Sequence, residues 1–223
     1  MKKALRYLCL LLVLLPSLAI ADNVSGVQAY QQGDYRLAFH EFQEAAKSGD
    51  PEAIYNLGTM YSDGIGIKVD NKKAMDLFKE AAKMGNTDAM VSIGYLYQNG
   101  LGIKKSFRQA SNWYFLAMRN GNVVMPAHNL GISYYKGLGI DKNYQKAMKY
   151  FSIAANAGDI PSQYYLGLGY LHGQGVAQNN QLAYEWLYRA EQGGYAPAQS
   201  ALAELYAKLT PAQIQQLKQG IGS

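Results

Sequence analysis

Apolar and polar positions repeat with helical spacing along almost the whole chain. They do so within a recurring sequence motif, which we call a phrase. The phrase joins a Leu-Gly or Ile-Gly pair, a tyrosine and a Gly-x-Gly turn. Its copies are YNLGTMYSDGIGI (55–67), VSIGYLYQNGLGI (91–103), HNLGISYYKGLGI (128–140), YYLGLGYLHGQGV (164–176) and a degenerate fifth, SALAELYAKL (200–209). Their reference positions, Gly58, Gly94, Gly131, Gly167 and Ala203, are 36, 37, 36 and 36 residues apart. A fixed period of this length is typical of a solenoid.

A second phrase lies between these copies. It reads LAFHEFQEAAKSG (37–49), KAMDLFKEAAKMG (73–85), QASNWYFLAMRNG (109–121), KAMKYFSIAANAG (146–158) and LAYEWLYRAEQGG (182–194). An alanine is followed by aromatic or leucine side chains three and four residues on, except for Glu41 in the first copy, and by a second alanine after seven, which is helical spacing. The two phrases predict two antiparallel helices per repeat. The expected fold is therefore all-α, a right-handed α/α solenoid of about five two-helix repeats of 36 residues.

Capping signals agree with these helices. Three polar residues that follow a glycine are expected to cap the first helix of their repeats, namely Asp50, Asn86 and Asp159. Four glycines fall just past the end of that helix, where the chain turns with positive φ, namely Gly64, Gly100, Gly137 and Gly173. The stretch DGIGIKVD (63–70) thus resembles a phosphate-binding glycine loop only in spelling. It recurs at the repeat period after a helix C-terminus, so it is predicted to be a structural turn.

The repeat is irregular at three places. The interval from Gly121 to Gly131 is one residue longer than its equivalents, which predicts a bulged turn at 123–126. At the ends, residues 22–33 predict an N-terminal capping helix, and residues 209–223 predict a C-terminal capping helix and tail that begins with Thr210 and Pro211. The solenoid proper is expected to span residues 34–208.

These phrases resemble the Sel-1-like repeat family, an offshoot of the tetratricopeptide repeats. Tyrosine stands three residues after every reference position, at Tyr61, Tyr97, Tyr134, Tyr170 and Tyr206. The resemblance implies a concave face built from the first helices and a role as an interaction scaffold. Exported bacterial relatives include host-interaction factors, regulators of envelope signalling and partners in polysaccharide secretion. A cysteine-rich branch is associated with penicillin binding, from which this chain departs because its only cysteine is Cys9.

A helical wheel of the first helix separates a core sector from an opposite sector whose positions need not pack within the repeat. That opposite sector is unexpectedly apolar and aromatic in the middle of the array. A partner-binding groove is therefore predicted there for a peptide or protein segment. Its residues are Tyr55, Val91, Tyr95, His128, Ile132, Tyr135, Tyr164, Leu168, Leu171 and His172.

A second interpretation of this sector stays open. Tight superhelical curvature would bring neighbouring first helices together, so that these side chains pack on one another. If the groove interpretation holds, acidic residues at one end, Glu52 and Asp63, and basic ones at the other, Lys136, His172 and Lys208, would orient the ligand.

Residues 1–21 have the three parts of a cleaved secretory signal. Lys2, Lys3 and Arg6 precede an apolar run, Leu8–Leu15, and a small-x-small site at Ala19-Ile20-Ala21. A membrane anchor is the competing interpretation, but the run is shorter than the roughly 20 residues that a span needs. We expect cleavage before Asp22 and a periplasmic or secreted protein with no transmembrane span.

Removing this segment changes the charge and the redox chemistry. The chain has 21 Lys and Arg against 16 Asp and Glu, which leaves 18 against 16 after cleavage. A net charge of +2 without a basic run argues against nucleic-acid binding. Cys9 is removed as well, so no disulfide is expected. A monomer that needs no cofactor is predicted.

Catalytic chemistry has little support in the sequence. His40, His128 and His172 fall in different repeats and make no metal-ligand spacing. Ser133 and Lys136 fit the Ser-x-x-Lys spelling of penicillin-interacting enzymes, but the companion motifs Ser-Asp-Asn and Lys-Thr-Gly do not occur. The prediction is a non-enzymatic binding scaffold or adaptor of the bacterial cell envelope. The alternatives are a secreted factor that acts on a host and, second, a penicillin-binding or β-lactamase-like enzyme.

Overall fold

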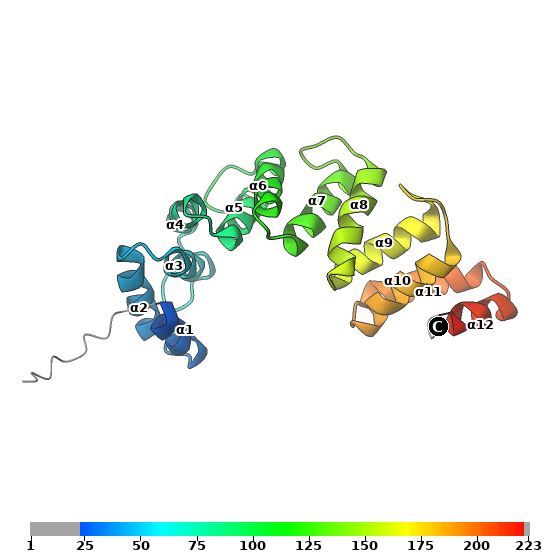
Figure 1. Ribbon diagram of the computed structural model, residues 1–223, viewed down its shortest axis with the longest axis horizontal. Coiled ribbons are helices and arrows are strands. Elements are labelled where there is room, and N and C mark those ends of the chain that lie inside the picture. Colours follow the sequence, from blue (N-terminus) through cyan, green and yellow to red (C-terminus); the bar gives the residue numbers. More distant parts are fainter. Residues whose placement is uncertain (1–22, 221–223) are drawn as a thin grey trace, which may run out of the picture.

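The protein is an arc of helices in the computed structural model, which describes residues 23–220 (Figure 1). Within that range all regular secondary structure is helical. The helices are α1 (Asn23–Gln31), α2 (Tyr35–Lys47), α3 (Pro51–Asp63), α4 (Asn71–Lys83), α5 (Thr87–Asn99), α6 (Phe107–Arg119), α7 (Val124–Lys136), α8 (Tyr144–Asn156), α9 (Ile160–His172), α10 (Asn180–Gln192), α11 (Ala196–Ala207) and α12 (Pro211–Gln219).

Consecutive helices pair, and the pairs stack along the arc. The pairs α1–α2, α3–α4, α5–α6, α7–α8 and α9–α10 form the most extensive helix contacts, and each pair also packs on the next. We number these pairs repeat 1 to repeat 5. From α3 to α8 the odd-numbered helices line the inner side of the arc and the even-numbered ones its outer side (Figure 1). The prediction of an α/α solenoid is confirmed.

In each repeat, a glycine of the first helix packs against a large side chain of the second helix, which lets the two helices approach closely. A Cβ atom on Gly58 would lie 2.7 Å from the ring of Phe78, and one on Gly131 would lie 2.6 Å from Phe151. Gly94 and Gly167 meet Tyr114 and Leu187 in the same way. Each large side chain comes from the second phrase and fills the space that the missing Cβ leaves. This close approach explains why the first phrase carries glycine inside a helix, where it otherwise costs about 1 kcal/mol.

The expected helix ends are confirmed. Asp50, Asn86 and Asp159 accept hydrogen bonds from the first backbone N–H groups of α3, α5 and α9. The glycines after α3, α5, α7 and α9 have φ of 71°, 73°, 73° and 66°. These caps satisfy helix-end groups that would otherwise be unpaired.

The extra residue lengthens one turn and removes one cap. Residues 120–123 separate α6 from α7, whereas 84–86 separate α4 from α5. Asn122 keeps the place of Asn86, because its N–H donates to the Ala117 carbonyl as that of Asn86 donates to Ala81. Val123 is inserted after it and makes no side-chain cap bond to α7. The predicted irregular turn is therefore present.

The second glycine of each Gly-x-Gly turn contacts the preceding repeat. A Cβ on Gly66 would lie 2.7 Å from Tyr35, and one on Gly102 would lie 2.7 Å from the Asn71 backbone. Gly139 and Gly175 approach the starts of α6 and α8 even more closely. Thus these glycines allow one repeat to stack on the previous one.

The N-terminal end differs from the sequence-based expectation, because α1 forms part of a repeat. The segment expected to be an N-terminal cap, α1, pairs with α2 through Gly26, which packs on Phe42 as the reference glycines pack on their partners. At the other end α12 begins with a capping box between Thr210 and Gln213.

The expected signal peptide lies outside the described residues. Among the helices from 23 to 220, none is both long and apolar enough to cross a bilayer.

Candidate functional site

A groove lies on the inner helices of repeats 2 to 4. Its volume is about 360 Å³, and it is open to solvent along one side. Residues from α3, α5 and the start of α7 form the walls, and buried Phe78 and Leu96 contribute to the lining. The lining comprises Tyr55, Thr59, Ser62, Asp63, Phe78, Asp88, Val91, Ser92, Tyr95, Leu96, Asn122, Met125 and Asn129.

Two large apolar side chains stand exposed at this groove. Tyr95 is 53% exposed and Met125 is 54% exposed, although both belong to helices that bury most of their apolar residues. Tyr55 packs with a ring-centroid distance of 5.7 Å on Phe78, and Val91 is half-buried. Three of the residues predicted from the sequence, Tyr55, Val91 and Tyr95, are thus brought together. Met125 was obscured in the sequence by the insertion at Val123, which shifts it relative to the repeat.

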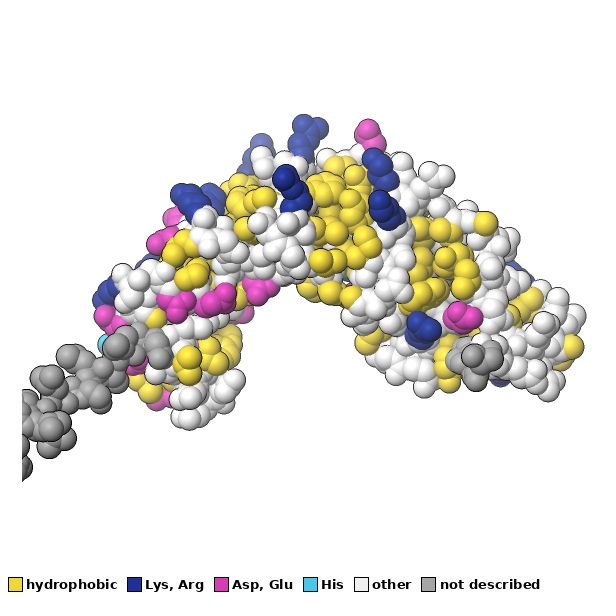
Figure 2. Space-filling view, viewed as in Figure 1, with side chains coloured by type: hydrophobic (Ala, Val, Ile, Leu, Met, Phe, Trp, Pro, Cys, Tyr) yellow, Lys and Arg dark blue, Asp and Glu magenta, His cyan; other side chains and the backbone are white. Residues whose placement is uncertain are grey.

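The groove is acidic. Asp63 and Asp88 line it, and no Lys or Arg does. Asp88 accepts a hydrogen bond of 2.7 Å from the Asn122 amide, and outside the groove Glu52 accepts one of 2.9 Å from Asn86. Figure 2 shows acidic side chains gathered along the inner side of the arc in its N-terminal half. An apolar surface bordered by carboxylates favours a ligand with apolar and basic groups.

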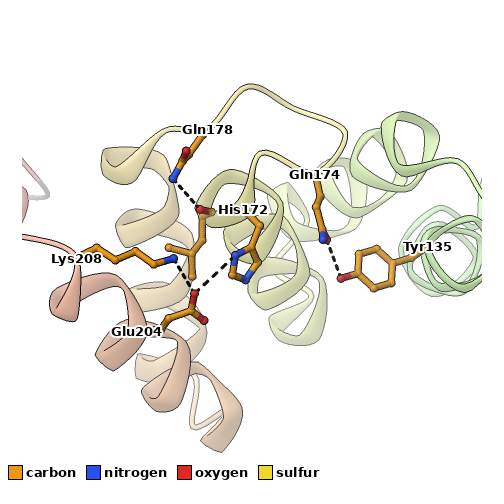
Figure 3. Close-up of polar contacts among 7 residues, drawn as sticks. Tyr135, His172, Gln174, Gln178, Glu204 and Lys208 are labelled. Atoms are coloured by element: carbon orange, nitrogen blue, oxygen red, sulfur yellow. Dashed lines mark hydrogen bonds and ion pairs between the residues drawn. The ribbon is translucent and has the colours of Figure 1, made fainter.

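The predicted residues of the C-terminal half pack between repeats instead. The Tyr135 ring lies 5.5 Å from that of Tyr165 and 5.2 Å from that of Tyr144, and its hydroxyl donates to Gln174 Oε1 at 3.0 Å (Figure 3). Burial raises the pKa of Tyr135, so the hydroxyl stays protonated and able to donate. Tyr164 lies 5.1 Å from Tyr195 of the next repeat. Ile132 and Leu168 are half-buried against the same cores.

Leu171 corrects the prediction. Its side chain is fully buried in the core that α9 shares with α10 and α11, so it offers no surface to a partner. The helical wheel places Leu171 on the inner sector, but the neighbouring α11 covers that part of α9. The packing interpretation therefore holds for this residue.

The two inner-face histidines both contact carboxylates. His128 Nδ1 lies 3.0 Å from Asp159 Oδ2 and 2.9 Å from Ser162 Oγ. His172 Nδ1 lies 3.7 Å from Glu204, which also pairs with Lys208 at 2.8 Å (Figure 3). The sequence predicted a basic end at His172 and Lys208, but Glu204 offsets the charge of both residues. The inner face is therefore acidic at one end and has no matching basic end at these two residues.

The candidate nucleophile lies in the interior. Ser133 is 3% exposed, and its hydroxyl donates to the Asn129 carbonyl at 2.9 Å. It occupies the buried position that Met60 and Leu96 hold in α3 and α5. A substrate would not reach this hydroxyl. Within residues 23–220 no group of three His, Cys, Asp or Glu side chains is arranged to hold a metal ion.

Paired helices, an internal glycine contact and an inner groove define an α/α repeat scaffold. The Sel1 repeat model matches residues 25–50, 51–86, 87–122, 127–159 and 160–195, which leaves out inserted Val123 and the first three residues of α7. The chain therefore belongs to the Sel1 repeat family, whose members are generally non-enzymatic scaffolds for protein interaction. The first matched repeat comprises α1 and α2, in agreement with the packing of Gly26 on Phe42.

Solved structures show the same architecture. A Sel1 repeat protein from Oxalobacter formigenes is 27% identical with a TM-score of 0.74, over 82% of this chain and 74% of that one. The protein c5321, described as a protective antigen present in uropathogenic Escherichia coli strains, is 31% identical with a TM-score of 0.74. That alignment covers 79% of this chain but 38% of c5321.

A curated relative matches over a shorter stretch. DAP3-binding cell death enhancer 1 from Rattus norvegicus is 42% identical over 59 residues, which is 26% of this chain and 12% of that protein. The mouse protein of the same name is 41% identical over a stretch of the same length. The chain thus spans about an eighth of these relatives, and the similarity is that of the repeat.

Proposed function

We propose that this protein is a non-enzymatic binding scaffold of the bacterial cell envelope that holds a peptide or protein segment in the groove over α3, α5 and α7. The observation that carries the proposal is the exposure of Tyr95 and Met125 beside half-buried Tyr55 and Val91. Exposed aromatic and methionine side chains in a concave site are typical anchors for a partner.

The charges around the groove define the chemistry of the segment. Asp63 and Asp88 would attract Lys or Arg side chains that flank an apolar anchor. Asn129 and Ser92 supply hydrogen-bonding groups in the same lining. The expected occupant is a short segment with one or two apolar side chains and adjacent basic residues.

The test is capture of partners from an envelope extract, followed by direct binding of the segment found. The double variant Tyr95→Ala with Met125→Ala should lose the captured protein and weaken its purified segment by about tenfold or more, since anchor residues often contribute above 1 kcal/mol. Leu116→Ala is the matched control, because Leu116 is an exposed apolar residue on the outer helix α6. Equal capture by all three proteins would refute the groove as the binding site.

Export is a separate part of the proposal and has its own test. The segment 1–21 predicts cleavage before Asp22, so cell fractionation with N-terminal sequencing should find the shortened chain outside the cytoplasm. Release into the medium would favour the secreted-factor alternative, to which the similarity to a protective antigen also points. Retention of an uncleaved chain in the cytoplasm would refute export.

A further inference from the structure

The turns that follow α3, α5 and α7 carry an unusual number of cations. These inner helices run in the same direction, so their C-terminal turns lie along one edge of the solenoid. Eight exposed cations stand on the turns or on the first helical turn after them, and we call this set the basic edge. It consists of Lys68, Lys72, Lys73, Lys104, Lys105, Arg108, Lys142 and Lys146.

The basic edge is not neutralised by neighbouring carboxylates. Every ion pair within 4.0 Å that the described residues make involves other side chains. Lys105 and Lys142 lie over the rings of Phe107 and Tyr144, at 4.8 and 4.6 Å from the centroids. Rings support the side chains without cancelling their charge. The carboxylates on the same turns, Asp70 and Asp141, are fewer than the cations, so the edge has a net positive charge.

The positive charge at these turns is confined to repeats 2 to 4. In repeat 5 the equivalent stretch, 173–182, contains only uncharged residues, with Gln178 at the place of Lys105 and Lys142. Because the whole chain has only five more cations than carboxylates, the basic edge reflects segregation rather than general excess. Figure 2 shows most of the visible Lys and Arg side chains along the outer rim over α4–α8, with a few acidic ones among them, and a row of acidic side chains on the inner side.

The basic edge contains one defined depression. Arg108, Lys142 and Lys146 line it together with Tyr134, Asp141 and the backbone of Gly139, and its volume is about 710 Å³. It forms where the turn after α7 rests on the start of α6, with Gly139 against Phe107 and Arg108. Three cations against the single carboxylate of Asp141 leave a site of net positive charge, which is large enough for a phosphate-bearing headgroup.

The residue types indicate what kind of surface the edge meets. Protein interfaces are depleted in lysine, and recognition of phosphates at fixed geometry favours the planar fork of arginine. Seven of the eight cations here are exposed lysines. Flexible lysines suit a surface whose anions have no fixed positions, as in a lipid bilayer, where each contributes about equally. We propose that the basic edge docks the protein on an anionic phospholipid surface, with a headgroup phosphate in the depression beside Arg108.

Docking by this edge goes beyond the proposed function and is compatible with it. The groove lies along the sides of α3, α5 and α7, whereas the basic edge lies beyond their C-terminal ends. A lipid-bound molecule would therefore keep Tyr95 and Met125 accessible to a partner.

The test is co-sedimentation of the purified protein with phosphatidylcholine vesicles that contain or lack phosphatidylglycerol. Binding should require phosphatidylglycerol and should fall as salt is raised, because the attraction is screened. The variant Lys104→Gln/Lys105→Gln/Lys142→Gln should bind on the order of a hundredfold more weakly. The control Lys83→Gln/Arg119→Gln/Lys149→Gln removes as many exposed charges from the outer helices of repeats 2 to 4 and should bind like the unaltered protein. Both variants keep residues 1–21, so that segment contributes equally.

Three outcomes would overturn the proposal. If both variants bind vesicles equally weakly, binding depends on the net charge of the protein and not on the basic edge. Absence of binding to phosphatidylglycerol vesicles would exclude the lipid surface. Binding to heparin in solution, lost in the edge variant, without binding to vesicles would assign the edge to a soluble polyanion. Circular dichroism of each variant shows whether the helices are retained.

Discussion

The His128 imidazole of α7 contacts the Asp159 carboxylate that caps α9, with Nδ1 and Oδ2 3.0 Å apart. The two residues belong to repeats 4 and 5, so a helix cap and an inter-repeat contact share one carboxylate. Ser162 completes the group, since its backbone N–H donates to Asp159 at 2.8 Å. A titratable pair thereby joins the two repeats.

This pair should make stability depend on pH. Burial alone would raise the pKa of Asp159, but hydrogen bonds from His128 and Ser162 outweigh it and hold that pKa below its usual value. The stabilisation is therefore complete above the unfolded carboxyl pKa of about 3.9 and is lost as pH falls through the lower folded value.

Asp159→Asn keeps the cap, as Asn86 shows in α5, and removes the charge. In urea unfolding, the loss of stability between about pH 6 and pH 3 should be smaller in this variant by up to about 1 kcal/mol. Asp50→Asn is the control, because Asp50 accepts only from the α3 backbone. The same change in both variants would contradict the role of His128.

A pair of glycines should separate backbone strain from inter-repeat contact. Gly158 and Gly175 have φ of 92° and 77°, but a Cβ on Gly158 meets nothing within 4 Å, whereas one on Gly175 would overlap the Tyr144 backbone. Gly158→Ala should cost about 1 kcal/mol of unfolding free energy from the positive φ alone. Gly175→Ala should cost clearly more, because repeats 4 and 5 must move apart. Chemical denaturation measures both, and equal costs would show that the turn does not set the stacking distance.

Asn86 should be intolerant of aspartate although its equivalents, Asp50 and Asp159, are aspartates. It is 6% exposed, caps α5 and donates to Glu52 at 2.9 Å. Asn86→Asp would place two carboxylates in contact and should destabilise the protein by about 1–3 kcal/mol. Adding Glu52→Gln should restore most of that loss, as measured by thermal unfolding. If the double variant is as unstable as the single one, the contact with Glu52 is not the cause.

Truncation should destabilise the protein strongly at Leu171 and hardly at Tyr95. Leu171→Ala removes a fully buried side chain and should lower the unfolding free energy by about 2–5 kcal/mol. Tyr95→Ala removes a side chain that is 53% exposed and should change stability by about 0.5 kcal/mol or less. A large loss in the Tyr95 variant would show that the residue is structural and would weaken the case for the groove.

Much of the fold could be predicted because its determinants are local. Helical spacing, cap residues and positive-φ glycines act over a few residues, and a period of 36 repeats them. The first helix, α1, was harder to assign to a repeat because its copy of the phrase is degenerate. Gly26 marks it as part of a repeat only through its contact with Phe42.

The groove could be predicted only in part because exposure depends on neighbouring repeats. In the C-terminal half α9 contacts α7 and α11 directly. Gly169 also brings α9 close to α8, since a Cβ there would overlap Met148. The inner side chains there, Tyr135, Tyr164 and Leu171, consequently pack between repeats. A groove stays open between α3, α5 and α7.

The sequence by itself determined the helices, their ends, the period and the glycine positions, because each of these depends on contacts within one repeat or at one turn. The tertiary structure decided which inner residues are buried, that Glu204 offsets His172 and Lys208, and that eight cations at three separate turns lie on one edge. Those features depend on how closely consecutive repeats stack. That spacing results from the summed packing of many side chains and cannot be read from the pattern of a single repeat.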